Sequence, residues 1–149
     1  MTVCVQRVLS ASVSVAGEVC AAIDRGLLVL LGVEQGDTEE NALFLARKCV
    51  GLRIFEDENG KMNRSLADIG GKLLVVSNFT LCGDWAKGRR PSFTRAEAPE
   101  KAKALCELLV NACRQEGFAV ETGVFGADMQ VSLVNDGPVT LLLDTNRLS

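Results

Sequence analysis

Two polar stretches carry the residue types that could do chemistry. The first is Ser77-Asn78-Phe79-Thr80, which supplies two hydroxyls and an amide directly after the apolar run at residues 73–76. The second is Asn135-Asp136-Gly137-Pro138-Val139-Thr140, far along the chain. Polar groups at the end of a buried strand are held rigidly, so they can orient a substrate and bond to it. The plainer alternatives are a core strand leading into a turn, and an ordinary Asp-Gly hairpin turn.

The chain contains no histidine. This excludes a Ser-His-Asp triad and a Cys-His pair, and it removes the commonest general base and metal ligand. Thr80 is therefore a weak nucleophile, because no base is available to take its proton. Any chemistry in this chain must therefore use hydroxyls, amides, carboxylates, backbone groups or the substrate itself.

The six cysteines include no C-x-x-C pair, so neither a zinc ribbon nor a thioredoxin-type site is indicated. Most of them lie among apolar residues and are expected to be small core side chains in a reducing compartment. We expect no metal and no cofactor. A thiol hydrolase is a poor alternative, because a cysteine such as Cys82 has no activating partner.

The net charge of −3 argues against unspecific coating of nucleic acid but permits a local basic patch. The dense basic cluster is Lys87, Arg89 and Arg90, in a loop-like segment that also holds Trp85. These side chains either lie in solvent or contact RNA phosphates. No apolar run approaches ~20 residues, and no basic segment leads into an apolar one at the N-terminus. We therefore expect a cytoplasmic protein that neither crosses nor binds a membrane.

Hydrophobic periodicity predicts the elements that must position these residues. Amphipathic helices are predicted at 38–51, with Asp37 or Thr38 as the cap, and at 97–116. Strands are predicted by apolar runs or alternation, and Asn135 to Pro138 separates the last two. The predicted strands cover residues 2–9, 13–23, 27–33, 52–55, 73–77, 120–122, 129–134 and 139–143.

The number and order of these elements indicate the fold class. Seven or eight strands and two helices in irregular order do not give the alternation of a doubly wound α/β sheet. A chain of 149 residues without repeats or linkers is about one domain, residues 1–149. We expect an α+β fold with a mixed, barrel-like sheet and two long covering helices.

At Ser77–Thr80 and Asn135–Thr140 the sequence resembles the D-aminoacyl-tRNA deacylase family. The likeness runs almost end to end. The resemblance implies a homodimer that hydrolyses the ester between a D-amino acid and the terminal adenosine of tRNA, and that also acts on glycyl-tRNA. The further matching blocks are Gly26 to Val33, Leu52 to Asp57, Gly60 to Asn63, Lys87-Gly88 with Arg90 to Phe93, and Phe125 to Met129.

The resemblance also implies roles for single residues. In the family a Gly-Pro dipeptide with a cis peptide bond enters the other subunit's pocket, which carries over to Gly137-Pro138. Such a backbone wall would block an L side chain, leave a D side chain pointing to solvent and admit glycine. Ser77 and Thr80 correspond to the polar floor of the pocket, where the 2′-hydroxyl of the RNA helps to activate water. The resemblance thus implies that the protein positions the ester and donates hydrogen bonds to the developing oxyanion, and we expect the donors to be backbone N–H groups near Phe79 and Thr80.

Three positions keep two interpretations each. Phe79 either stacks on the terminal adenine or fills the core, and Met129 has the same ambiguity. On sequence grounds Arg7, inside the first strand, is an edge or surface charge. The resemblance instead implies that it braces the Gly-Pro segment.

Asn78 departs from the family, which usually has glutamine here. Losing one methylene shortens the reach by more than an ångström, given C–C bonds of about 1.5 Å. Two alternatives follow: the related deacylase that removes L-alanine, which has threonine and asparagine at these positions, and a tRNA-binding paralogue without catalysis. Ser77 and the intact Asn135–Thr140 block favour the D-specific enzyme.

Overall fold

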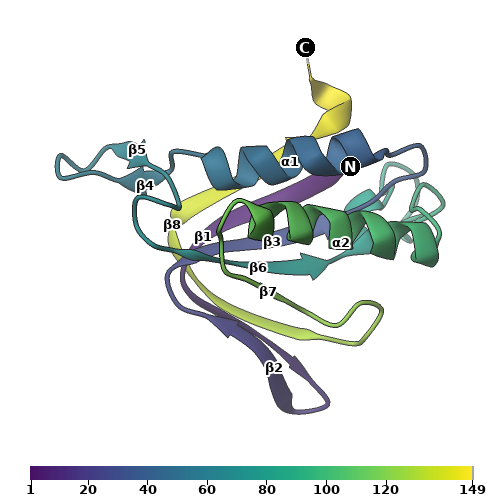
Figure 1. Cartoon of the computed structure of the whole chain (residues 1–149). Coiled ribbons are helices and arrows are strands. Elements are labelled where there is room, and N and C mark those ends of the chain that lie inside the picture. Colours follow the sequence, from purple (N-terminus) through teal and green to yellow (C-terminus); the bar gives the residue numbers. More distant parts are fainter. Residues whose placement is uncertain (149) are drawn as a thin grey trace.

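Two helices lie across one face of a strongly curved, six-stranded sheet (Figure 1). The computed structural model describes residues 1–148. The helices are α1 (Glu39–Gly51) and α2 (Pro99–Gln115), and two short 3₁₀ turns are η1 (Phe79–Cys82) and η2 (Thr145–Arg147). The sheet holds β1 (Thr2–Val15), β2 (Glu18–Ile23), β3 (Gly26–Gly32), β6 (Lys72–Ser77), β7 (Val120–Thr122) and β8 (Gln130–Asp144). A separate hairpin consists of β4 (Phe55–Glu56) and β5 (Met62–Arg64).

The long strand β1 is the centre of the sheet. On one side it pairs antiparallel with β3 and then with β2, and on the other side it pairs with β8 along almost its full length. The pairs β3–β6 and β6–β7 are parallel. The sheet curls into a nearly closed barrel, with both helices packed outside it (Figure 1). The predicted α+β class, with a mixed barrel-like sheet and two covering helices, is confirmed.

Strands β3 and β6 are buried on both faces, as their unbroken apolar runs predict. Alternate residues of each strand point to opposite sides, so Leu73 and Val75 face the helices while Leu74 and Val76 face the barrel interior. The core therefore has two parts, one between sheet and helices and one inside the curled sheet. This double burial fixes the end of β6, where the polar residues begin.

The predicted helices are confirmed, but the strands predicted at 13–23 and 52–55 are wrong. Thr38 caps α1 in a reciprocal bond with Asn41. Residues 13–23 are not one strand, because Ala16 and Gly17 both have positive φ and form a tight turn between β1 and β2. The strand predicted at 52–55 lies instead at Phe55–Glu56. No helix in residues 1–148 is long and apolar enough to cross a membrane.

The predicted turn between residues 134 and 139 is also different in the structure. Both flanking segments belong to one strand, β8, and both pair with β1. Asn135 lies opposite Val8 and Thr140 opposite Gln6, so Arg7 alone faces residues 136–139. The segment is therefore a wide bulge in a continuous strand and not a hairpin turn.

Candidate active site

A cavity of about 820 Å³ lies beyond the C-terminal end of β6. The first half of α2 and the segment between β7 and β8 form its sides. Its size is typical of small-molecule sites, and most of its lining is apolar. Of the predicted site residues, it brings together Ser77, Asn78, Phe79 and Met129.

Asn78 closes a tight turn immediately after β6. Its Oδ1 accepts a hydrogen bond from the Thr80 backbone N–H at 3.2 Å and another from the Thr80 hydroxyl. Asn78 is thus the cap of η1. The Thr80 hydroxyl and N–H are both engaged within this turn, and Thr80 does not line the cavity.

One backbone donor at the cavity is left free by this turn. Within residues 1–148, the Phe79 N–H has no hydrogen-bond acceptor, whereas the N–H groups of Asn78, Thr80 and Leu81 all have one. We expected donors near both Phe79 and Thr80, but the Thr80 N–H already bonds to Asn78. The Phe79 N–H is therefore the backbone group that can meet a developing oxyanion here.

The Phe79 ring does not fill the core. It is 60% exposed and lies on the cavity wall. The Phe79 and Phe93 rings form a T-shaped contact, with a centroid distance of 5.3 Å and an interplanar angle of 75°. Met129 is partly buried against the interior core and lines the cavity as well. Phe79 thus offers an open aromatic face, while Met129 is both a core and a cavity residue.

The bulge in β8 is closed at its base by Asn135. Its Nδ2 donates to the Arg7 carbonyl at 3.1 Å and to the Val139 carbonyl at 3.0 Å. Gly137 is required at the tip, because a Cβ there would lie 2.0 Å from the Val139 nitrogen. The Gly137–Pro138 peptide bond is cis. The backbone of this bulge is therefore tightly specified by its own contacts.

Arg7 is 5% exposed, so its interpretation as a surface charge is wrong. Its Nε donates to the Asp136 carbonyl at 2.8 Å and lies 3.3 Å from the Asp136 carboxylate. Its Nη1 donates to the Ile54 carbonyl at 2.7 Å. The bulge removes the Asp136 carbonyl from the β1–β8 ladder, and a carbonyl without a ladder partner needs another donor. Arg7 supplies that donor and ties the bulge to the segment before β4.

Gly137 and Pro138 are exposed at the tip of the bulge. Within the part of the chain that the structure describes, neither residue lines the cavity at the end of β6. The predicted site residues thus fall into two groups: Ser77, Asn78, Phe79 and Met129 at the cavity, and Arg7 with Gly137 and Pro138 at the bulge. Residues 1–148 of this chain do not bring the two groups together in one cavity.

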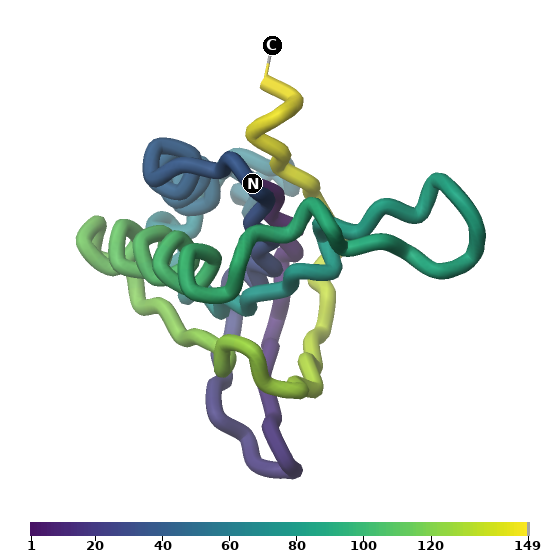
Figure 2. Tube along the Cα trace, turned by 90° about the vertical axis from the view of Figure 1, so that its right-hand side faces the viewer, coloured from purple at the N-terminus to yellow at the C-terminus, as the bar shows by residue number. Residues whose placement is uncertain are grey.

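The predicted basic cluster lies outside both groups. Residues 83–93 leave the body as a projecting loop (Figure 2), pinned at its base by backbone bonds between Asp84 and Ser92. Lys87, Arg89 and Arg90 are exposed on this loop, and Trp85 is 81% exposed. The loop connects to the cavity through Phe93, which contacts Phe79.

A cysteine thiol also lines the cavity, at Cys106. Burial, with a contribution from the Glu107 carboxylate, raises the pKa of this thiol to about 11. Burial raises the pKa of Cys82 to about 11 as well, helped by Glu34 and Asp37. A thiol with that pKa is ionised in about one molecule in a thousand at pH 8. Neither cysteine is therefore a nucleophile at neutral pH.

Residues 1–148 contain no cluster of three or more Cys, Asp or Glu side chains placed to hold a metal ion. All six cysteines are free thiols. Four of them are buried, whereas Cys4 is half-buried and Cys20 is exposed. The expected core role thus fits most of them.

The structure adds cavity residues that the sequence reasoning missed. Gln6 lines the cavity, and its Nε2 donates to the Thr140 hydroxyl at 3.3 Å, which links the cavity to the end of the bulge. Glu97 lines it at the start of α2, and the Ala98 N–H, followed by the Lys101 side chain, holds the pKa of Glu97 below its usual value. The alternation of side chains along β1 could have placed Gln6 on the cavity face.

Comparison with known proteins gives one consistent result. The family model described as D-Tyr-tRNA(Tyr) deacylase matches residues 4–144. The chain is 57% identical over 148 residues to the D-aminoacyl-tRNA deacylase of Thermosipho africanus, covering 99% of both chains. It is 59% identical over 147 residues to that of Koribacter versatilis, again covering 99% of each. Among solved structures, the c-Myc DNA unwinding element binding protein matches with a TM-score of 0.91 and 41% identity, over 97% of this chain and 99% of that one.

Proposed function

The chain belongs to the D-Tyr-tRNA(Tyr) deacylase family. On that premise we propose that it binds a D-aminoacyl-tRNA in the cavity at the end of β6 and hydrolyses the ester there. The terminal adenosine enters the cavity at the end of β6. The open Phe79 face stacks on the base, as aromatic side chains commonly do with nucleobases. The ester carbonyl then lies next to the Phe79 N–H.

The hydrolysis itself is ordinary ester chemistry assisted by position. Water adds to the carbonyl carbon, the carbonyl oxygen becomes an oxyanion, and the bond to the ribose oxygen breaks as that oxygen takes a proton. Free D-amino acid and tRNA leave. The neighbouring 2′-hydroxyl of the RNA helps to activate the water, and the Phe79 N–H stabilises the oxyanion.

The free Phe79 N–H beside an open aromatic face is the observation that carries this proposal. A single oriented donor stabilises charge that develops only in the transition state, which is how an enzyme raises kcat. The chain has no histidine, and the cavity thiol stays protonated because burial raises its pKa. Positioning of the RNA ester therefore accounts for the chemistry better than a protein nucleophile.

We also propose that the active enzyme is a homodimer whose bulges cross between subunits. The bulge is exposed, and exposed apolar side chains flank it on β8: Val134 at 51%, Leu141 at 38% and Leu142 at 68%. Apolar side chains gathered on an edge strand favour a protein partner. A second copy's Gly137–Pro138 tip would complete the cavity, reject L side chains and admit glycine.

The same proposal gives the 83–93 loop a role. Lys87, Arg89 and Arg90 bind phosphates of the tRNA, and the exposed Trp85 ring provides an apolar contact. Because tRNA is cytoplasmic, so is the enzyme.

A panel of four aminoacyl-tRNAs tests the proposed function. D-Tyrosyl-tRNA and glycyl-tRNA should be cleaved, and L-tyrosyl-tRNA should not. Fastest cleavage of L-alanyl-tRNA would instead assign the chain to the related L-alanine-removing enzyme. Undiminished tRNA binding without any cleavage would indicate a binding paralogue, and recovery of turnover in Asn78→Gln would then identify Asn78 as the cause.

A further inference from the structure

A second cavity, of about 380 Å³, lies against α2 on the side of β6 and β7. It shares Ser77, Cys106 and Phe125 with the main cavity, so the two cavities lie side by side. Thr122, Gly123 and Val110 also line it. A ligand in the main cavity is therefore bound next to this second cavity.

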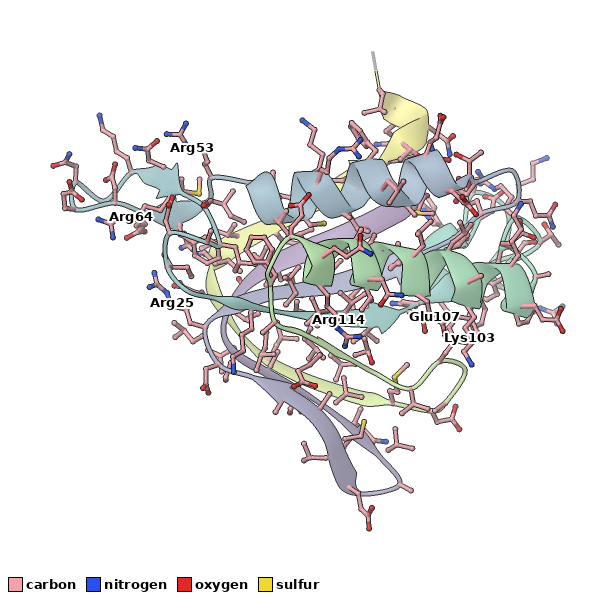
Figure 3. All side chains as sticks on the ribbon, in the orientation of Figure 1. Arg25, Arg53, Arg64, Lys103, Glu107 and Arg114 are labelled. Carbon is pink, nitrogen blue, oxygen red and sulfur yellow. The ribbon has the colours of Figure 1, made fainter. Side chains whose placement is uncertain are left out.

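The rim of the second cavity carries charge from one face of α2. Lys103, Glu107 and Arg114 extend from the helix toward β6 and β7 (Figure 3). Their spacing of four and seven residues keeps them on the same helix face. The net charge of the three side chains is positive, although the chain as a whole carries −3.

The two cations are available to an anion. Arg114 donates one hydrogen bond, from Nη2 to the Val120 carbonyl at 2.7 Å, which fixes the guanidinium and leaves its other N–H groups free. Within residues 1–148, none of the ion pairs includes Lys103. The labelled arginines at the other end of the molecule differ, because Arg53 bonds to Asn63 and Arg64 pairs with Glu58 (Figure 3).

A fixed guanidinium next to a free ammonium is a typical phosphate site. We propose that the second cavity binds the phosphodiester on the 5′ side of the terminal adenosine of the substrate. This rests on the proposed function, which places that adenosine in the main cavity. Glu107 lies between the two cations and weakens anion binding, so the site favours a phosphate delivered by the bound substrate over free phosphate.

Two small esters test the proposal. One is the D-tyrosyl ester of adenosine, and the other is the D-tyrosyl ester of adenosine 5′-phosphate. A charge-assisted phosphate contact should lower KM about tenfold for the phosphorylated ester in the wild type. We call this ratio of the two KM values the gain. Lys103→Ala should abolish the gain with kcat unchanged, and Lys103→Arg should keep it. Glu107→Gln should enlarge the gain.

Two controls distinguish loss of this phosphate site from a general change in surface charge and from a disturbed fold. Arg47→Ala removes an exposed cation on α1 and should keep the full gain. Arg114→Gln should lose the gain, and its melting temperature shows whether loss of the Val120 bond disturbs the fold. Equal KM values for the two esters in the wild type, or a full gain in Lys103→Ala, would overturn the proposal alone. Failure of the wild type to cleave either ester would overturn it together with the proposed function.

Discussion

Asn78 organises the residues around it. Asparagine oxygens commonly accept the N–H two residues later, and here that N–H belongs to Thr80. A glutamine at this position would carry the amide past that N–H. Asparagine in place of glutamine therefore extends less far into the cavity, but it closes a turn that leaves the Phe79 N–H free. The sequence predicted the importance of Ser77–Thr80, but which donor stays free depends on how the turn closes.

The Thr80 hydroxyl should be dispensable for the chemical step. It donates to the Asn78 side chain, and no base is present to activate it. Thr80→Ala should lower the hydrolysis rate of D-tyrosyl-tRNA about fivefold, as expected for one lost hydrogen bond of about 1 kcal/mol. Single-turnover assays measure this, with Thr80→Ser as the control that keeps the hydroxyl. Complete loss of hydrolysis with intact tRNA binding would restore Thr80 as a nucleophile.

At the scale of elements, the bulge in β8 shows where sequence reasoning reaches its limit. Asn-Asp-Gly-Pro between two apolar segments is a typical hairpin signal. The same four residues can also form a bulge, so the local sequence does not distinguish the two structures. Only the pairing of both segments with β1 distinguishes the two. The helices and the doubly buried strands, by contrast, follow from local periodicity, as at α1 and β6. Local periodicity could not predict the burial of Arg7, because its partners are carbonyls 47 and 129 residues away, and only the family resemblance pointed to its contact with the Gly-Pro segment.

Arg7 should stabilise the bulge strongly. Arg7→Met should lower the free energy of unfolding by about 2–4 kcal/mol, since it removes charge-assisted bonds to Asp136 and Ile54. Arg7→Lys should recover only part of this lost free energy of unfolding, because one ammonium cannot reproduce the geometry of the guanidinium. Urea denaturation measures both variants. Arg95→Met, which removes an exposed pair with Asp84, is the control and should change stability by less than about 1 kcal/mol. Equal effects of Arg7→Met and Arg95→Met would contradict the bracing role.

The contact between α1 and α2 should weaken at alkaline pH. Burial, with help from Cys113, raises the pKa of the Cys49 thiol to about 12, and burial with help from Glu116 raises that of Cys113 to about 11. A group with a raised pKa in the folded state binds its proton more tightly there than in the unfolded chain. Its contribution to stability is therefore complete below about pH 9 and decreases as the pH rises toward 11–12.

Urea denaturation under reducing conditions between pH 7 and pH 10.5 tests this. The wild type should lose stability above about pH 9, and Cys49→Ala should lose less over the same range. Cys20→Ser changes an exposed thiol and should follow the wild type. Parallel curves for the wild type and Cys49→Ala would show that the buried thiol does not contribute.

At the scale of the whole molecule, we propose that two copies of the chain complete one site. The cavity at the end of β6 has the polar groups and the free donor, but within residues 1–148 the Gly137–Pro138 tip of the same chain does not line it. The bulge in β8 has a braced backbone that projects from the surface, with exposed apolar side chains beside it. In the proposed homodimer, the bulge of each copy would complete the cavity of the other. Chirality would then be sensed by main chain, which has no rotamers to adjust.

The ratio of D-tyrosyl-tRNA to L-tyrosyl-tRNA hydrolysis, measured for the wild type and for Pro138→Ala, tests this account most directly. Pro138 lies exposed at the tip of the bulge and outside the cavity of its own subunit, so its removal should alter the wall and leave the donor at Phe79 in place. We predict a high ratio in the wild type and a much lower one in Pro138→Ala, through faster cleavage of the L ester. An unchanged ratio in the folded variant, or equal cleavage of both esters by the wild type, would contradict the account.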